Sequence, residues 1–195
     1  MKCGKELEDE RLEYCGDCSD SALPFVRNYA VWHYDRQMKR SVMEFKYGGR
    51  REYTGFYVHH MAGRYGERLL RHGVTALVPV PVSEKRKRSR GYNQAELLAR
   101  GMADKLGIPV INLLKRVKNT KPQSGLSKRE RKHNLTGAFA WNMAEAKKWE
   151  VLPKTVALID DIYTTGATLA ACTEVLQDNG IAAVYGLCVC IGNNR

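Results

Sequence analysis

No stretch of the 195-residue chain approaches the roughly 20 consecutive apolar residues that a membrane-spanning helix needs. The first twenty residues are acidic and lack the apolar segment of a secretory signal peptide. The sequence also lacks internal repeats and a helix-turn-helix pattern, and it has no Gly-Lys-Ser/Thr motif, which excludes a P-loop nucleotide site. We therefore expect a cytoplasmic protein without membrane insertion.

The positive charge of the chain is concentrated in two segments. The formal net charge is +11, of which residues 85–90 contribute +5 and residues 115–133 contribute +7. A charged run is often only a solvated face, but this concentration also suits a polyanionic partner or a phosphate-rich ligand. The second segment is long, polar and contains glycine, which is typical of a functional or disordered loop.

Six cysteines in a chain without a secretory signal indicate thiols or metal ligands rather than disulfides. Cys15 and Cys18 have the spacing of a zinc knuckle, and Cys3 is a third ligand candidate. A closed zinc site has four ligands, so three alternatives stay open. The fourth ligand precedes a truncated chain start, it is His33 or another group, or the knuckle has decayed. We expect the remaining cysteines to be core residues: Cys172, Cys188 and Cys190.

The most informative stretch runs from Thr155 to Gly180. Its apolar run at 156–159 predicts a strand that is buried on both faces. Two acids and a short loop follow, and then a helical pattern that ends at Asn179-Gly180. A strand, a tight loop and a helix N-terminus in succession form a ready anion site, because free N–H groups and the helix dipole point toward the loop.

The polar residues of this stretch predict the ligand. Three hydroxyls surround Gly166 and suit the oxygens of a phosphate monoester: Thr164, Thr165 and Thr168. The adjacent Asp160 and Asp161 suit a pair of ribose hydroxyls, since carboxylates accept the hydrogen bonds that hydroxyls donate. Together they predict a site for ribose 5-phosphate.

The rest of the chain alternates strand and helix patterns. Apolar runs with strand character occur at 28–34, 75–82, 108–114, 137–141 and 184–190. The second of these should leave the sheet near Val80, because prolines cannot donate to a strand ladder. Helical patterns occur at 36–46, 52–70 and between Gly91 and Gly107, and His59 and His60 are expected on a helix surface. This order predicts an α/β fold with a mainly parallel central sheet flanked by helices.

The string IDDIYTTGAT at 159–168 resembles the PRPP-binding loop of type I phosphoribosyltransferases. The resemblance implies that fold, with a cysteine segment at 1–20, a helical hood at 21–74 and a core at 75–195 that contains the flexible basic loop 115–133. It also implies a magnesium ion on the pyrophosphate of PRPP. Seven residues would bind PRPP: Asp160, Asp161, Thr164, Thr165, Gly166, Ala167 and Thr168. In an enzyme, the two acids would also be catalytic, stabilising an oxocarbenium-like ribose.

Further segments are similar to the ComF family (ComFC or GntX-like proteins) of phosphoribosyltransferase-fold competence proteins. They are the cysteine knuckle, Phe45–Arg50, Val78–Pro81, Arg90–Ala95, Thr120–Gln123 with Leu126, Arg131, Asn134 and Gly137–Phe139, and the loop at 160–168. Tyr92 stands where phenylalanine is also common, and the first cysteine of the knuckle is missing. The resemblance implies a role in bringing imported single-stranded DNA to recombination, with a helicase-like competence partner.

The basic segments have two expected uses. Arginines bind phosphate oxygens bidentately, so we expect Arg90, Arg129 and Arg131 to bind pyrophosphate. The surplus cations suit single-stranded nucleic acid, with Tyr92, His133 and Trp141 for stacking: Lys85, Arg86, Lys87, Arg88, Lys118 and Lys121. Three hypotheses stay open: a ComF-type protein that binds PRPP and single-stranded DNA, an active phosphoribosyltransferase with an unidentified acceptor, and a PRPP-sensing regulator.

Overall fold

The protein is described by a computed structural model that covers residues 2–5, 11, 15–19, 23–118, 130 and 134–192. Four of the residues that we expect to contact phosphate or nucleic acid lie outside this described part: Lys121, Arg129, Arg131 and His133.

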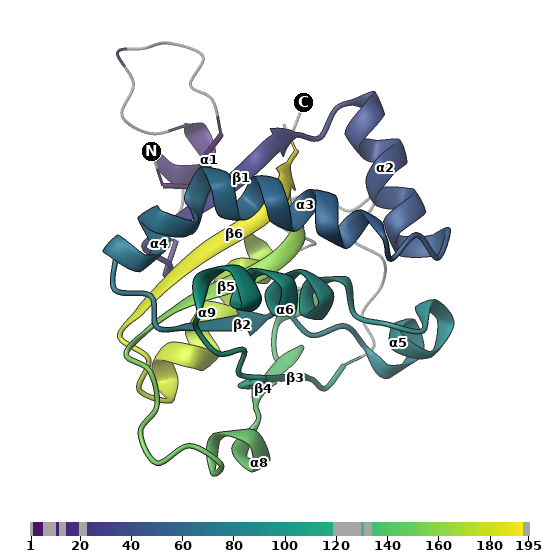
Figure 1. The fold of residues 1–195 in the computed structure, drawn as a ribbon. Coiled ribbons are helices and arrows are strands. Elements are labelled where there is room, and N and C mark those ends of the chain that lie inside the picture. The colour runs from purple at the N-terminus through teal and green to yellow at the C-terminus, as the bar shows by residue number, and fades with distance from the viewer. Residues whose placement is uncertain are drawn as a thin grey trace.

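The centre of the molecule is a parallel sheet with the strand order β1-β6-β5-β2 (Figure 1). Its strands are β1 (Arg27–His33), β2 (Ala76–Pro79), β5 (Thr155–Tyr163) and β6 (Ala183–Ile191). A separate antiparallel pair is formed by β3 (Leu114–Arg116) and β4 (Phe139–Trp141). β1 belongs to the segment that we expect to form a hood, so the main sheet includes one strand from before residue 75.

Helices surround this sheet. They are α1 (Gly16–Ser19), α2 (Arg36–Tyr47), α3 (Tyr53–Met61), α4 (Glu67–Arg71), α5 (Glu84–Arg90), α6 (Gln94–Leu106), α8 (Met143–Ala146) and α9 (Ala167–Asp178). In the described part of the chain, none of them has the length and apolar character needed to cross a bilayer.

Two apolar cores lie on opposite faces of the sheet, because successive strand residues point to opposite sides. Val156 and Leu158 of β5 belong to one core, together with α9 and the β3–β4 pair. Ala157 and Ile159 belong to the other core, which is covered by α2, α3 and α6. The predicted α/β class, with a parallel sheet flanked by helices, is therefore confirmed.

Prolines limit the strand pairing of β2 and of the segment beside it. β2 ends at Pro79, next to the exit predicted near Val80, since neither Pro79 nor Pro81 can donate to a strand ladder. The predicted strand at 108–114 is wrong for most of its length, since Val110 forms only an isolated bridge with Leu77. Pro109 accepts a hydrogen bond from the Leu77 N–H but has no N–H to return. Regular pairing begins again only at Leu114, so the first residues of the expected basic loop belong to β3.

The predicted helix at 52–70 is confirmed over nearly its whole length, but a π-helical turn, η1 (Ala62–Gly66), separates α3 from α4. Gly66 lies in this turn at close approach to α6, because a Cβ added there would be 2.6 Å from a methyl carbon of Leu106. Met61 before the turn and Leu69 after it are both fully buried.

Candidate functional site

The loop after β5 is shaped by Gly166. This glycine has φ 77° and forms the N-cap of α9, which starts at Ala167. A side chain at this position would collide with the Tyr163 hydroxyl as well as strain the backbone. The Gly192 N–H holds the other side of the loop by donating to the Tyr163 carbonyl at 2.7 Å. The predicted order of strand, tight loop and helix N-terminus is thus confirmed.

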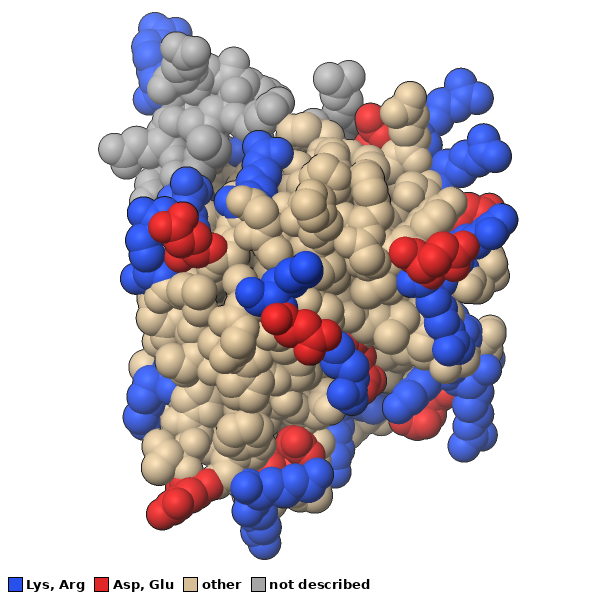
Figure 2. Space-filling model, in the orientation of Figure 1, with Lys and Arg blue, Asp and Glu red and all other residues tan. Residues whose placement is uncertain are grey.

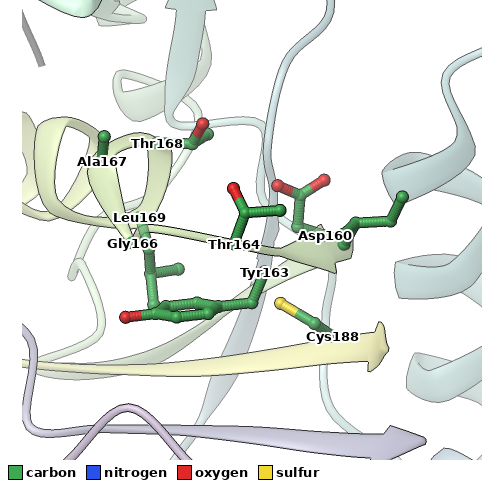
Figure 3. Close-up of a pocket in the computed structure, with 9 residues that line it drawn as sticks. Asp160, Tyr163, Thr164, Gly166, Ala167, Thr168, Leu169 and Cys188 are labelled. Atoms are coloured by element: carbon green, nitrogen blue, oxygen red, sulfur yellow. The ribbon is translucent and has the colours of Figure 1, made fainter. Parts of the chain in front are cut away.

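A pocket with about 290 Å³ of empty space, part of it open solvent, lies between β5, β6 and the start of α9 (Figure 3). Because this space includes open solvent, the enclosed part of the pocket has room only for a small polar group. It is lined by Asp160, Ile162, Tyr163, Thr164, Gly166, Ala167, Thr168, Leu169 and Cys188. Figure 3 shows the side-chain oxygens of Asp160, Thr164 and Thr168 on the same side of the loop.

Thr165 is the predicted loop residue that does not line the pocket. Its side chain is buried, and its Oγ1 accepts a hydrogen bond from the Ala167 N–H at 3.5 Å. The structure therefore brings together five of the seven residues predicted for PRPP, and Thr165 instead supports the turn into α9.

Asp160 is a half-buried carboxyl that lines the pocket. The Asp161 N–H donates to its Oδ1 at 2.8 Å. Burial, and then the negative charge of Asp161, raise the pKa of Asp160 from its usual 3.8 to about 7, against an opposing effect of Lys46. Near neutral pH this group can therefore exchange a proton, and in its ionised form it accepts hydrogen bonds from hydroxyls.

Asp161 lies on the other face of the sheet. Lys46 Nζ lies 2.9 Å from its Oδ1, and the side chains of Lys46 and Asp161 are only 16% and 12% exposed. Burial lowers the pKa of Lys46, but the charge and hydrogen bond of Asp161, together with the charge of Asp160, outweigh it, so the pKa is raised. Since strand neighbours point in opposite directions, Asp160 and Asp161 do not lie side by side at one pocket. This corrects the expected arrangement in which both carboxylates meet one ribose diol.

Arg90, a predicted pyrophosphate ligand, lies on the Asp161 side. Its guanidinium donates to the Tyr47 hydroxyl at 2.8 Å and to the Gln94 side-chain oxygen at 3.0 Å. It also lies over the Tyr47 ring, 4.6 Å from the centroid, and its charge acts to lower the pKa of Lys46. Lys46 and Arg90 therefore form a pair of neighbouring cations near Asp161.

The first basic segment is the helix α5. The Ser83 hydroxyl caps it by accepting from the Arg86 N–H, and Gly91 ends it at φ 77°. Of the four residues of α5 predicted to contact nucleic acid, three are exposed: Lys85, Lys87 and Arg88. The fourth, Arg86, is half-buried. Basic side chains gather on the right-hand side of Figure 2, the side on which Figure 1 places α2 and α5.

Tyr92 is not available for stacking. Only 7% of it is exposed, and its hydroxyl donates to the Phe45 carbonyl. The Arg51 guanidinium covers the ring at 4.6 Å from the centroid. The expectation that Tyr92 stacks on a base is therefore wrong, because the ring packs in the core that α2, α3 and α6 cover. Lys118, another predicted contact, donates to the Thr136 carbonyl at 3.0 Å.

Two basic residues near the acids had no role in the sequence analysis. Lys46 lies in the Phe45–Arg50 segment of the family resemblance, but nothing local shows its pairing with Asp161. Arg116 lies over the Phe139 ring at 5.2 Å, and burial followed by the charge of Arg86 lowers its pKa. Phe139 belongs to the core that contains Val156 and Leu158, so Arg116 lies on the pocket side of the sheet, where the charges of Cys172 and Asp160 partly offset this effect.

The three N-terminal cysteines meet at one point. The sulfur atoms of Cys3, Cys15 and Cys18 all lie within 4.8 Å of one another, and those of Cys3 and Cys15 are 3.3 Å apart. Four Zn–S bonds of about 2.3 Å in a tetrahedron place thiolates about 3.8 Å apart, so this cluster fits a zinc ion. Without a metal, burial raises the pKa of Cys3 to about 12.

His33 does not complete this cluster. The Asn28 amide donates to the Cys3 carbonyl, which places Cys3 at the start of β1. His33 lies five residues further along that strand, or about 16 Å at about 3.3 Å per residue. The other cysteines are buried, and the expectation that they are core residues is confirmed: Cys172, Cys188 and Cys190.

Known proteins match this chain over almost its whole length. Competence protein F of Haemophilus influenzae is 34% identical over 191 residues, which cover 95% of this chain and 82% of that protein. The chain belongs to the ComF family. DNA utilization protein YhgH of Salmonella typhimurium is 31% identical over 97% of this chain and 82% of its own length. Competence protein ComFC of Bacillus subtilis is 32% identical over 87% and 68%.

No protein-family model matches the chain. The ComF resemblance seen in the short segments is nevertheless confirmed, because the similarity to Competence protein F covers 95% of the chain.

Proposed function

We propose that this ComF family protein acts in the cytoplasm in the uptake or utilization of DNA, and that the pocket after β5 binds the ribose 5-phosphate part of PRPP. The names of its relatives, competence protein and DNA utilization protein, support the first part. The pocket supports the second, because it combines the N-terminus of a 12-residue helix with Asp160, Thr164 and Thr168.

In this proposal, the phosphate lies against the loop at 164–168. The N–H groups at the start of α9 and the hydroxyls of Thr164 and Thr168 donate to its oxygens. Thr165 contributes through the turn that it stabilises. Ionised Asp160 accepts a hydrogen bond from a ribose hydroxyl, which is the contact that distinguishes a sugar phosphate from inorganic phosphate.

The pyrophosphate of PRPP would then lie toward the cations. Lys46 and Arg90 are held at the same edge of the sheet. We propose that Arg129 and Arg131 also bind the pyrophosphate. Asp161 positions Lys46. Carboxylate and phosphate oxygens suit Mg²⁺, so Asp160 and the pyrophosphate fit a magnesium ion, which would neutralise the charge of the phosphates.

We further propose that Cys3, Cys15 and Cys18 hold a structural zinc ion, because their thiolates meet at the spacing of a zinc site. Single-stranded DNA would contact the exposed cations of α5, together with Lys118 and Lys121. A helicase-like competence partner completes the proposal, by resemblance to the family.

Titration calorimetry with PRPP and Mg²⁺ tests the pocket. We expect Asp160→Asn and Thr168→Val each to weaken binding by about tenfold or more, since each removes a hydrogen bond to a charged or buried group. The exposed acid Asp104 provides the control Asp104→Asn, which should bind like the wild type. Equal binding by all variants would sink the assignment of the loop.

A second function, transfer of phosphoribose to an acceptor, is favoured by one observation. Asp160 is a half-buried carboxyl at the pocket whose pKa is raised to about 7, a property often found at catalytic positions. Incubation with PRPP, Mg²⁺ and a panel of nucleobase and amine acceptors should then release pyrophosphate. No release above the Asp160→Asn background would leave binding as the function of the pocket.

A further inference from the structure

We propose that single-stranded DNA also binds along the outer edge of the sheet, on aromatic and arginine side chains from β1 and the α3–η1–α4 run. This inference rests on the proposed function in DNA handling and adds a surface outside both basic segments. We call this surface the β1 track. The residues that carry the argument are Trp32, Phe56, His60, Arg64, Arg68 and His72.

One end of the β1 track is an aromatic platform at the carboxyl end of β1. Trp32 and Phe56 are stacked, with ring centroids 5.5 Å apart and an interplanar angle of 8°. His60 contacts the edges of both, at 5.2 Å from Trp32 and 4.7 Å from Phe56. Phe56 is 55% exposed although it is a large apolar side chain. An exposed stacked pair is the kind of surface on which a nucleobase stacks.

The other end of the β1 track is a second set of stacked rings. His72 is nearly parallel to Tyr185, with an angle of 6° and centroids 4.9 Å apart. Tyr29 connects this stack to the helix, because its hydroxyl is 2.9 Å from His72 Nε2 and its ring is 4.9 Å from Tyr65. Tyr185 pairs with Arg27 and Trp32 lies five residues further along β1, so the rings follow the strand over about 16 Å at about 3.3 Å per residue.

Arginines accompany these rings. Arg27 and Arg68 lie over the Tyr29 ring at 5.6 and 5.8 Å, and Arg64 lies over Tyr65 at 5.7 Å. The sequences of β1 and of 53–71 contain four arginines but a single acid, Glu67. Figure 2 shows a broad uncharged area where Figure 1 places α3, bordered by basic and acidic side chains. Cations beside stacked rings complement the phosphates and bases of a single strand.

The backbone edge of β1 does not favour the alternative of a peptide that adds a strand. The Asn28 N–H already donates to the Lys2 carbonyl at 2.8 Å. The Ala30 carbonyl accepts from the Tyr65 hydroxyl, and the Val31 carbonyl accepts from Arg64, both at 3.0 Å. Strand addition needs such edge groups, so a partner here binds through side chains.

The β1 track adds stacked rings to the charge of the basic helix α5, beside which one ring is exposed, that of Tyr47 next to Arg90. Tyr92, the aromatic residue that follows α5 in the chain, is buried under Arg51. Cations alone bind any polyanion, whereas exposed rings select strands whose bases are unpaired and can stack. Duplex DNA hides its bases, so the track distinguishes the two forms.

The test is fluorescence anisotropy of a 5′-fluorescein oligothymidylate of 20 nucleotides, titrated with the full chain at several salt concentrations. We expect Phe56→Ala to weaken binding about tenfold, which corresponds to the loss of one base stack. Arg68→Gln should weaken it about threefold and make the salt dependence shallower by about 0.7 in the log–log slope. The exposed Lys105 of α6 gives the charge-matched control Lys105→Gln, which should bind like the wild type.

A second measurement does not depend on affinity. A base stacked at Trp32 should quench its fluorescence, so Trp32→Phe should lose most of the quenching that the oligonucleotide causes, whereas Trp149→Phe should retain it. Phe56 and Arg68 are exposed, so their variants should fold, and circular dichroism checks this.

The outcomes separate the β1 track from the proposed function. If the wild type binds and only a Gln variant of Lys85, Arg86, Lys87 and Arg88 loses affinity, α5 binds the DNA and the track is refuted. If the wild type does not bind the oligonucleotide at all, the proposed DNA function fails together with the track. Preference for a duplex of equal length would also overturn the track.

Discussion

Asp160 and Asp161 are neighbours in sequence but lie in two different environments. Asp160 faces a pocket of hydroxyls and a helix N-terminus, and burial raises its pKa to about 7. Asp161 faces the side of the sheet that α2, α3 and α6 cover, and it is paired with Lys46 at 2.9 Å. A pair of acids before a loop therefore does not act as a unit when both lie within a strand. One residue can contact a ligand while the other holds a cation in place.

The largest expected effect on stability comes from removing Lys46, the cation that is paired with Asp161. Lys46→Met leaves a buried carboxylate without its partner, so we expect a loss of about 3–5 kcal/mol in the free energy of unfolding. Urea denaturation measures it. Lys46→Arg keeps the charge and should lose much less, and a loss below about 1 kcal/mol in Lys46→Met would show that the pair is effectively solvated.

The loop that separates the two environments is tested by Gly166→Ala. The substitution strains a residue at φ 77° and introduces a clash with the Tyr163 hydroxyl, so we expect a loss of about 2–3 kcal/mol. Gly180→Ala is the matched control, because Gly180 has φ 90° but open space around it, and should lose about 1 kcal/mol. Similar losses in both variants would mean that the clash with Tyr163 is relieved by movement.

The pH dependence of the stability of Asp160→Asn tests the raised pKa of Asp160. The folded protein holds a proton on Asp160 up to about pH 7, whereas the unfolded chain releases it near pH 3.8. Stability due to this group therefore falls as pH rises from about 4 to 7, and Asn avoids this loss. We expect Asp160→Asn to be more stable than the wild type by about 1–3 kcal/mol at pH 8, with the gain shrinking toward pH 4.

Thermal unfolding at several pH values measures this gain. Asp161→Asn should behave in the opposite way and destabilise at neutral pH, because Lys46 loses its partner. A pH-independent difference between Asp160→Asn and the wild type would contradict the raised pKa.

The smallest effect on stability is expected for Arg90→Gln. Arg90 bonds to Tyr47 and Gln94 near the surface, so its loss should change stability by less than about 0.5 kcal/mol. Its loss should still weaken PRPP binding about tenfold in calorimetry, since a guanidinium contact to phosphate is removed. Unchanged binding would place the pyrophosphate away from the Asp161 side.

Local signals predicted the fold well. The apolar run before Asp160, the glycine at the loop and the Asn179-Gly180 end of the helix each act within a few residues, and all appear as predicted. The main difference is the length of β5, which continues to Tyr163 and so includes both acids. Pairing with β6 as far as Ile191 extends the strand, and such tertiary pairing cannot be found from the residues of β5 alone.

The environment of the site was less predictable, because it depends on contacts between distant residues. Lys46 and Asp161 are far apart in sequence, and no spacing rule joins a helix end to a strand. Tyr92 follows a basic run and suggests a surface ring, yet it packs under Arg51 and bonds to Phe45. The platform of Trp32 and Phe56 likewise comes from two elements that are adjacent only in the folded chain.

The π-helical turn η1 accommodates one residue more than a regular α-helical turn, and this sets the direction in which the side chains of α4 point. Each residue of an α-helix turns the following ones by about 100°, so a regular α-helix of the same residues without the π turn would rotate all of α4 by about 100° about its axis. Leu69 would then leave the core, and Arg68 would no longer lie over Tyr29. The single extra residue thus allows one continuous helix to bury its apolar side before and after the turn while it presents arginines along β1.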